Sequence, residues 1–273
     1  MKDPAPQLLV NGKPLDCMST LDRGLLYGDG IFETIAVSGG RLCHWERHLQ
    51  RLQSGCERLG MATVDGMQLA EECGLLIQQL QRAVVKIIIT RGCGGRGYRV
   101  PEQPRPTRVI QLHDWPDYPA SCAVSGVRTR ICHTRLGQNA ALAGIKHLNR
   151  LEQVLARQEW NDPEIMEGLL LDTGGHLVEG TMSNVFMVKD GCLLTPDLTL
   201  CGVAGIMRGR VLELAKQHSI ELRIQPITLD TLLQADEAFV CNSLIGIWPV
   251  TGVDEQVFPR GPVSVRLQAL LAD

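Results

Sequence analysis

The chain has 273 residues, of which 44% are hydrophobic and 21% charged, so it can bury a sizeable core in one large domain or two small ones, and its composition argues against a disordered protein. Its formal net charge of -3 gives no electrostatic basis for binding nucleic acid or an anionic membrane, and we expect a small-molecule partner instead. The N-terminus shows no apolar signal core and no window reaches the roughly 18 apolar residues of a spanning helix, so we expect a cytoplasmic protein without a membrane partner.

The first part of the chain alternates short strands with amphipathic helices. Residues 7–10 predict a strand closed by an Asn-Gly turn, and residues 22–37 predict a glycine-rich loop that runs into an alternating strand. Apolar residues at helical spacing predict a helix over 45–59, and a second helix is expected from 67 to about 81. Arg51 lies off the apolar face of the first helix, where a solvated arginine is usual.

A strand predicted over 84–90 leads into a glycine-rich loop at 91–98. The loop formally matches the dinucleotide pattern Gly-x-Gly-x-x-Gly, but three prolines follow where a Rossmann fold needs a helix, so we do not expect dinucleotide binding. A strand over 108–112 and a connector rich in turn formers follow. This break predicts two domains, 1–118 and 122–273.

The second domain should begin with a strand over 124–131 and contain a hairpin over 168–179. Glycines at 202 and 205 then lead into an amphipathic helix, and the free amides at such a helix start bind phosphate well. A short helix and turn over 229–237, a strand over 238–241 and a final helix over 262–271 complete the chain.

The ten cysteines are scattered through apparently regular segments, without a Cys-x-x-Cys pair and without a cluster with histidine. This spacing is not typical of a disulfide framework or a metal site. We therefore expect reduced core cysteines and no bound metal.

Lys146 is the best candidate for a nucleophilic amine among the six lysines. It follows the turn-prone pair Ala143-Gly144 and precedes leucines at helical spacing, which predicts a loop-to-helix junction and a helix running to about residue 160. A partly buried amine there would become a usable nucleophile for a carbonyl. Lys86 interrupts an apolar strand and remains the alternative, whereas the other four have ordinary explanations at a terminus, in turns or near a helix end.

Residues 144–154, Gly-Ile-Lys-His-Leu-Asn-Arg-Leu-Glu-Gln-Val, resemble the lysine segment of bacterial 4-amino-4-deoxychorismate lyases, which are fold-type IV pyridoxal phosphate enzymes like the branched-chain and D-amino acid aminotransferases. Further similar segments are Tyr-Gly-Asp-Gly-Ile-Phe-Glu at 27–33, the loop at 91–98, Glu-Gly-Thr-Met-Ser-Asn-Val-Phe at 179–186, and the region 235–242. The resemblance implies a homodimer with a smaller α+β N-terminal domain and a larger α/β C-terminal domain. The C-terminal domain would carry the lysine, with pyridoxal 5'-phosphate at the domain interface.

The resemblance also implies individual roles. Lys146 would hold the cofactor as a Schiff base and act on the substrate, and we expect Thr34 to relay a proton, because the lyases have threonine there. The expected cofactor ligands are Arg51 at the phosphate, Glu179 at the pyridine nitrogen, and Asn184, Gly205, Ile206, Met207 and Ser243 around them. The expected substrate ligands are Arg91, Arg96 and Asn242.

Together these residues predict a lyase that eliminates pyruvate from 4-amino-4-deoxychorismate to give 4-aminobenzoate, a folate precursor. An aminotransferase of the same fold, acting on D-amino or branched-chain amino acids, is the first alternative. It would be favoured by glycine and threonine in place of Asn242 and Ser243 and by an apolar residue in place of Thr34. A non-catalytic small-molecule binding protein, in which Lys146 is structural, is the second.

Overall fold

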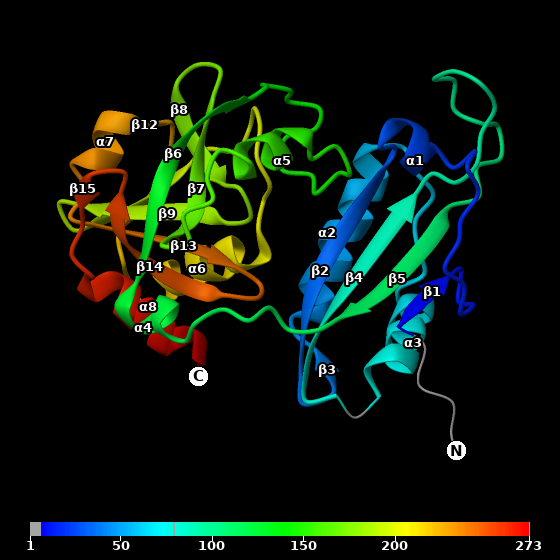
Figure 1. Cartoon of the computed structure of the whole chain (residues 1–273), viewed down its shortest axis with the longest axis horizontal. Coiled ribbons are helices and arrows are strands. Elements are labelled where there is room, and N and C mark those ends of the chain that lie inside the picture. Colours follow the sequence, from blue (N-terminus) through cyan, green and yellow to red (C-terminus); the bar gives the residue numbers. More distant parts are fainter. Residues whose placement is uncertain (1–6, 79, 273) are drawn as a thin grey trace. The chain divides into compact units, whose positions relative to one another are not determined.

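The computed structural model describes residues 7–78 and 80–272 and divides into two compact units (Figure 1). Unit 1 runs to Asp117 and also contains Ile145–Asn149, and unit 2 comprises Tyr118–Gly144 and the chain from Arg150 onwards. Each unit mixes helices with one sheet. The predicted break near residue 118 agrees with this division, but the lysine segment groups with unit 1 and not, as predicted, with the C-terminal domain.

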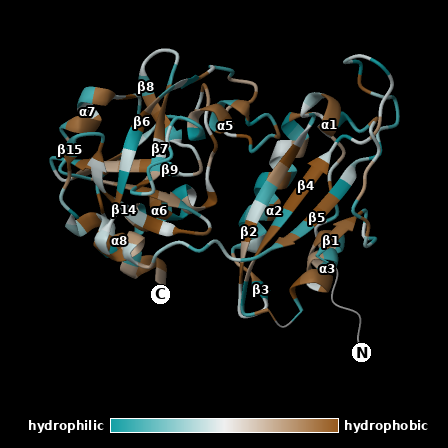
Figure 2. Ribbon diagram, viewed as in Figure 1, coloured by the Kyte–Doolittle hydropathy of each residue, from teal (hydrophilic) through white to brown (hydrophobic). Residues whose placement is uncertain are grey.

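Unit 1 is built on an antiparallel sheet of five strands in the order β1-β5-β4-β2-β3. The strands are β1 (Leu8–Val10), β2 (Gly30–Ser38), β3 (Arg41–Leu42), β4 (Arg82–Thr90) and β5 (Thr107–His113). Figure 2 shows that β4 is apolar along most of its length. Its charged residues are Arg82 at its start and Lys86 in its middle. The strands predicted over 7–10, at the end of 22–37, over 84–90 and over 108–112 are confirmed.

Three helices belong to unit 1: α1 (Arg23–Tyr27), α2 (Trp45–Arg58) and α3 (Gly66–Ile77). The helices α2 and α3 confirm the periodicity, although α3 ends at Ile77, short of the predicted end. The short helix α1 was expected to be loop. It forms because the Asp22 side chain caps it by accepting from the Gly24 amide, and it ends where Gly28 adopts a positive φ of 65°.

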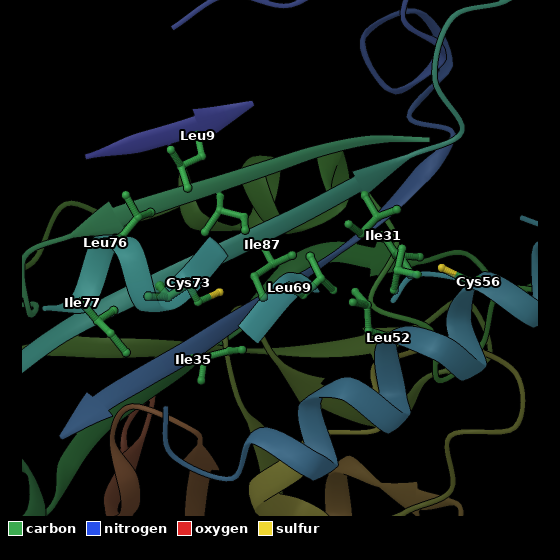
Figure 3. Close-up of a cluster of buried hydrophobic side chains, with 14 of the residues drawn as sticks. Leu9, Ile31, Ile35, Leu52, Cys56, Leu69, Cys73, Leu76, Ile77 and Ile87 are labelled. Atoms are coloured by element: carbon green, nitrogen blue, oxygen red, sulfur yellow. The ribbon is translucent and has the colours of Figure 1, made fainter. Parts of the chain in front are cut away.

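The core of unit 1 lies on the face of the sheet that α2 and α3 cover (Figure 3). Ile31, Ile35 and Ile87 point from the strands toward Leu52 of α2 and Leu69 of α3. Successive strand residues face opposite sides, so Phe32, Thr34 and Lys86 occupy the other face. One face of this sheet thus forms the core of unit 1, and the opposite face, called the polar face below, carries Thr34 and Lys86.

The segment Ile145–Asn149 lies beside the first residues of β2 and extends the sheet of unit 1. The amide of Phe32 donates to the carbonyl of Lys146 at 2.9 Å, and the amide of Leu148 donates to the carbonyl of Gly30 at 3.0 Å. The side chain of Ile145, only 3% exposed, belongs to the core of unit 1. These bonds give the physical reason why the segment is extended and not, as predicted, the start of a helix.

The helix that follows, α5 (Leu151–Arg157), is shorter than predicted. Its leucines lie at the predicted helical spacing, but Leu151 and Leu155 are 75% and 55% exposed, and Val154 on the same side is 48% exposed. The helix packs instead through Ala156, which is fully buried. Helical spacing predicted the helix but not which face is buried.

Unit 2 contains a mixed sheet of ten strands in which β6–β7, β6–β14 and β10–β11 pair in parallel. The path is β11-β10-β9-β13-β14-β6-β7-β8-β12, with β15 paired to β14. The strands are β6 (Val127–Leu136), β7 (Ile165–Asp172), β8 (His176–Gly180), β9 (Asn184–Lys189), β10 (Cys192–Pro196), β11 (Leu222–Gln225), β12 (Ile227–Thr228), β13 (Glu237–Asn242), β14 (Gly246–Val253) and β15 (Gln256–Val257).

Both faces of this sheet are covered at its centre. Residues of β9 and β13 alternate between a core with α4 (Ser121–Ser125) and α7 (Leu229–Leu233) and a core with α6 (Ile206–Gln217) and α8 (Pro262–Ala272). The helix α4 forms at the end of the predicted connector, so the first strand begins at Val127 and not at residue 124.

The ten cysteines all have free thiols, and seven are buried, whereas Cys17 and Cys93 are exposed and Cys43 is partly exposed. The expectation of core cysteines therefore holds for most but not all of them. Among the residues that the structure describes, no helix combines the length and the apolar character needed to cross a membrane.

Candidate active site

Lys146 lies against the ring of Phe32 on the polar face of the unit 1 sheet. Its Nζ is 4.4 Å from the ring centroid, and the side chain is partly buried. Lys86 approaches the same ring, with Nζ at 5.5 Å from the centroid, and pairs directly across the sheet with Thr34. The two amines that the sequence singled out therefore share one surface with the predicted relay hydroxyl.

Arg51 is held on the core side of the same sheet by a buried acid. Its Nε donates to Oε1 of Glu33 at 2.8 Å and its Nη2 donates to Oε2. His48 Nδ1 also lies 2.6 Å from Oε2, and Glu33 is 1% exposed. Burial favours the protonated form of Glu33, but the charges and hydrogen bonds of Arg51 and His48 outweigh it, so the pKa of Glu33 lies below its ordinary value.

Arg91 has a structural role that was not predicted. It is 6% exposed, and its guanidinium donates to Asp29 Oδ2 at 2.8 Å, to the carbonyl of Gly60 at 2.8 Å and to the carbonyl of Leu59 at 2.8 Å. These acceptors take one donor from each of its three nitrogens, so Arg91 fixes the end of α2 against Asp29. Its predicted substrate contact stays a prediction. Arg96, in contrast, is exposed in the glycine-rich loop.

Glu179 holds the loop that precedes α6 in unit 2. Its Oε2 accepts from the amide of Val203 at 2.7 Å, and its Oε1 accepts from Nε2 of Gln153 at 3.4 Å. Arg150 adds a positive charge nearby: burial lowers the pKa of Arg150, and the charge of Glu179 acts in the opposite direction. Glu179 is thus a 4% exposed acid that accepts from a backbone amide and lies near the charge of Arg150.

The same loop is bonded to the residue that precedes the lysine segment. Gly144 donates its amide to the carbonyl of Gly202 at 2.8 Å and accepts from the amide of Ala204 at 3.1 Å. Gly144 also adopts a positive φ of 79°, which only glycine reaches easily. Lys146 follows it by two residues in the sequence, so the loop held by Glu179 and the lysine are tied together through the chain.

Asn184 orders the entrance of α6, and its predicted cofactor contact stays a prediction. Its Nδ2 donates to the carbonyl of Val203 at 2.9 Å and its Oδ1 accepts from the amide of Gly205 at 3.1 Å. The Gly205 amide is therefore used within the protein. The helix has no side-chain cap, so the amides of its first turn, which begins with Ile206 and Met207, are the phosphate donors that remain from the prediction.

The residues of unit 2 fit the pyridine nitrogen and phosphate of pyridoxal phosphate. A Cβ on Gly205 would lie 2.0 Å from Asn184 Oδ1, and a Cβ on Gly202 would lie 2.7 Å from a methyl of Val178, so the backbone comes close only because both are glycine. An uncapped helix start suits a phosphate, and a buried carboxylate suits a protonated pyridine nitrogen. In the described residues, no three His, Cys, Asp or Glu side chains are grouped to hold a metal.

The loop from Thr181 to Ser183 is held by a buried acid that was not predicted and by Asn242. Glu167, 1% exposed, accepts from both hydroxyls and from the amides of Thr181 and Met182. Asn242 donates Nδ2 to the carbonyl of Met182 at 3.0 Å and accepts from the amides of Leu244 and Ile245. Asn242 therefore has a local role, and its predicted substrate contact stays a prediction, as does the phosphate contact of the neighbouring Ser243.

Sequence patterns missed the roles of two acids, one imidazole and one amide behind the site, namely Glu33, Glu167, His48 and Gln153. An acid inside an apolar strand, as Glu33 is, was the one available signal, since such a residue is buried only with a partner.

The family model for class IV amino-transferases matches residues 30–253. Aminodeoxychorismate lyase of Vibrio harveyi is 38% identical over 96% of this chain and 98% of its own length. A putative branched-chain-amino-acid aminotransferase of Methanocaldococcus jannaschii is 32% identical over 98% and 96%.

Among solved structures, 4-amino-4-deoxychorismate lyase from Pseudomonas aeruginosa matches with a TM-score of 0.94 and 47% identity, covering 97% of this chain and 98% of that one. The branched-chain amino acid aminotransferase of Escherichia coli matches with a TM-score of 0.87 and 28% identity, covering 98% and 94%.

Proposed function

The chain belongs to the class IV amino-transferase family, and on that premise we propose that it eliminates pyruvate from 4-amino-4-deoxychorismate to give 4-aminobenzoate. The fold is the expected fold-type IV architecture. Within the family, the lyases from Vibrio and Pseudomonas share more identical residues with the chain than the aminotransferases do, which supports a lyase. Pyridoxal 5'-phosphate is the cofactor in this proposal.

The observation that carries the proposal is the bonding of Gly144 to the loop that Glu179 holds. Gly144 bonds to Gly202 and Ala204, and Glu179 bonds to Val203 between them. The amine of Lys146 follows two residues later in the chain. A carbonyl-reactive lysine and a carboxylate for a pyridine nitrogen are thus linked through one short stretch of backbone.

Bound pyridoxal phosphate would supply an electron sink for the ring carbon that bears the substrate amine. Glu179 would hold the pyridine nitrogen in its protonated form, and Arg51 and the first amides of α6 would bind the phosphate. Lys146 would remove the proton from the amine-bearing carbon. Asn184 would keep the Val203–Gly205 backbone in place.

Thr34 and Lys86 would act on the substrate from the polar face of the unit 1 sheet. Departing pyruvate needs a proton at its methylene carbon, and the hydroxyl of Thr34 would relay it. The substrate also carries two carboxylates, and Lys86, opposite Thr34 in the sheet, offers a positive charge on the same face. Arg96 of the exposed loop is the second candidate for a carboxylate.

The product 4-aminobenzoate would enter folate synthesis, and we place the protein in the cytoplasm. We also propose a homodimer, because α1 and α5 expose apolar side chains at helical spacing: Leu25 is 64% exposed and Leu151 is 75% exposed. Light scattering should give the mass of a dimer, and a Leu155→Glu variant should lower it.

The decisive experiment is incubation of the holoenzyme with 4-amino-4-deoxychorismate in the absence of any keto acid. Sustained formation of 4-aminobenzoate and pyruvate is expected. A requirement for an amino acceptor would instead identify an aminotransferase, in which the amino group stays on the cofactor.

The role of Lys146 is tested against that of Lys86. Borohydride reduction of the yellow holoenzyme followed by peptide mapping should place the cofactor on Lys146, and Lys146→Ala should abolish turnover. Lys86→Met should keep the label on Lys146 and raise KM. A label on Lys86 would reverse the two assignments, and a colourless protein that cannot be reconstituted would support a non-catalytic protein.

A further inference from the structure

Arg23 of α1 is a buried arginine that grips the glycine-rich loop. It is 4% exposed, and its Nη1 donates to the carbonyls of Gly97 at 3.2 Å and Arg99 at 3.4 Å, while Nη2 donates to that of Tyr98 at 3.2 Å. Three consecutive carbonyls therefore converge on one guanidinium. Only an arginine offers a fork of donors that can reach all three at once.

The rest of the Arg23 side chain is fixed from the opposite side. Its Nε donates to Asp29 Oδ2 at 2.7 Å, and the same carboxylate oxygen accepts from Arg91. Arg91 in turn bonds to Leu59 and Gly60 at the end of α2. A continuous polar chain thus joins the tip of the loop to the helix that carries Arg51.

The charges in this chain are balanced to keep Asp29 ionised. Burial favours the protonated form of Asp29, but the hydrogen bonds and charges of Arg91 and Arg23 outweigh it, so the pKa of Asp29 is lowered. Asp29 can therefore orient both guanidinium groups at neutral pH.

The loop wraps closely around Arg23. A Cβ on Gly94 would lie 3.0 Å from Cδ of Arg23, and Gly97 has a positive φ of 90°. The Gly97 amide also donates to the hydroxyl of Tyr27 at 3.2 Å, and the rings of Tyr27 and Tyr98 lie 5.3 Å apart. Arg96 stands at the exposed turn just before the three gripped carbonyls.

We propose that Arg23 is a positioning residue that fixes the loop at 95–99 and so sets the direction in which Arg96 meets a carboxylate of the substrate. This inference rests on the proposed lyase function for its substrate, but not for the fixing of the loop. Arg23 touches neither the reacting atoms nor the cofactor in this assignment.

The test compares wild-type holoenzyme with Arg23→Lys and Arg23→Gln. Each variant loses at least two of the loop bonds, so trypsin should cleave after Arg96 or Arg99 about tenfold faster, as mapped by mass spectrometry. KM for 4-amino-4-deoxychorismate should rise about tenfold, which corresponds to one lost charge-assisted bond, while kcat and the Kd for pyridoxal phosphate stay near the wild-type values.

Two further variants keep the test decisive. Glu71→Gln changes an exposed charge on α3 of the same unit, at a residue that belongs neither to the loop nor to the polar chain and, among the described residues, pairs with no trypsin site, and should match the wild type. Tyr27→Phe removes only the hydroxyl that binds the Gly97 amide, and should shift both readouts in the same direction but less, even if the Arg23 variants fold poorly.

Unchanged cleavage, or faster cleavage with an unchanged KM, would overturn the positioning role. An Arg96→Gln variant with normal KM would overturn it as well, because the loop would then present nothing to the substrate. The proposed lyase function is tested separately: it is wrong if the wild-type enzyme forms no 4-aminobenzoate without an acceptor. In that case the rate of trypsin cleavage would still decide whether Arg23 fixes the loop.

Discussion

Glu33 is a buried acid that holds Arg51, the proposed ligand of the cofactor phosphate, in one orientation. The two bonds from Arg51 fix the plane of its guanidinium, whereas a lone arginine on a helix surface would sample many rotamers. Removal of the acid would have two opposing effects on a bound phosphate: the site would gain net positive charge, but the guanidinium would lose its fixed orientation. Because Glu33 is buried and Arg51 largely so, we expect the loss of orientation to dominate.

Glu33→Gln should therefore weaken binding of pyridoxal phosphate about tenfold, the effect of one charge-assisted hydrogen bond. Binding of pyridoxal, which lacks the phosphate, should not change. Absorbance titration of the apoprotein with both compounds measures the difference. Glu72→Gln is the matched control, since Glu72 accepts from Nε and Nη2 of Arg108 in the same unit. Equal losses for the two compounds, or tighter phosphate binding, would show that Glu33 does not position Arg51.

For single residues, the sequence indicated which residue types the site needs better than it indicated their hydrogen-bond partners. Motifs singled out Lys146 and Glu179 as candidates, because the chemistry of a pyridoxal site needs an amine and a carboxylate. The bonds of Arg91 were not predicted, because a sequence does not show which donors bind backbone carbonyls such as that of Gly60. Arg23 was overlooked for the same reason, since its acceptors lie more than seventy residues away in the chain.

The start of helix α6 depends on two glycines with different surroundings. Gly205 is the N-cap and has an ordinary φ of -68°, so the obstacle to a side chain there is steric: its Cβ would lie 2.0 Å from Asn184 Oδ1. Gly209, one turn later in the same helix, would place a Cβ with nothing within 4 Å of it. A substitution at Gly205 therefore tests the proposed phosphate site, whereas one at Gly209 tests only the stability of the helix.

Gly205→Ala should displace the Asn184 amide, lower the melting temperature, and weaken the binding of pyridoxal phosphate more than that of pyridoxal. Gly209→Ala should leave both affinities unchanged and stabilise the helix by up to about 1 kcal/mol. Thermal melts and the same titrations provide the measurements. If Gly205→Ala behaved like Gly209→Ala, the helix start would have no part in phosphate binding.

Elements were predicted well where one face is buried and poorly where a strand or a neighbour overrides the pattern. The helix α2 and the strand β2 have the expected periodicity. The strand β9 is buried on both faces and so lacks an alternating pattern that a sequence could reveal. Leu148 belongs to no helix, because pairing with Gly30 satisfies its amide in extended backbone.

The whole molecule should lose stability in mild acid. In both units carboxylates have lowered pKa values, among them Glu33 and Asp29 in unit 1 and Asp172 and Glu159 in unit 2. A carboxylate whose pKa is lower in the folded state contributes stability that is present above its unfolded value, here 4.5 for Glu and 3.8 for Asp, and is lost as pH falls through the folded value.

Melting temperature should therefore change little between neutral pH and about pH 5.5, and fall steeply below about pH 4.5. Glu33→Gln should melt lower at neutral pH but lose less on acidification, because one titrating group has been removed. Calorimetry at several pH values tests this. Parallel curves for the variant and the wild type would mean that Glu33 does not contribute to the acid sensitivity.

The placing of Ile145–Asn149 in unit 1, with both flanking segments in unit 2, means that neither unit is one uninterrupted length of polypeptide. A protein divided after Asp117 would give a shorter fragment without the strip that borders β2, and a longer fragment carrying that strip with no β2 to pair with. Neither fragment would be expected to reach its native form by itself, whereas the two mixed together could complete each other. The two units of this enzyme therefore cannot be separated as independent domains. Lys146, the proposed reactive residue, belongs to the sheet of unit 1 although the segments on both sides of Ile145–Asn149 in the sequence belong to unit 2.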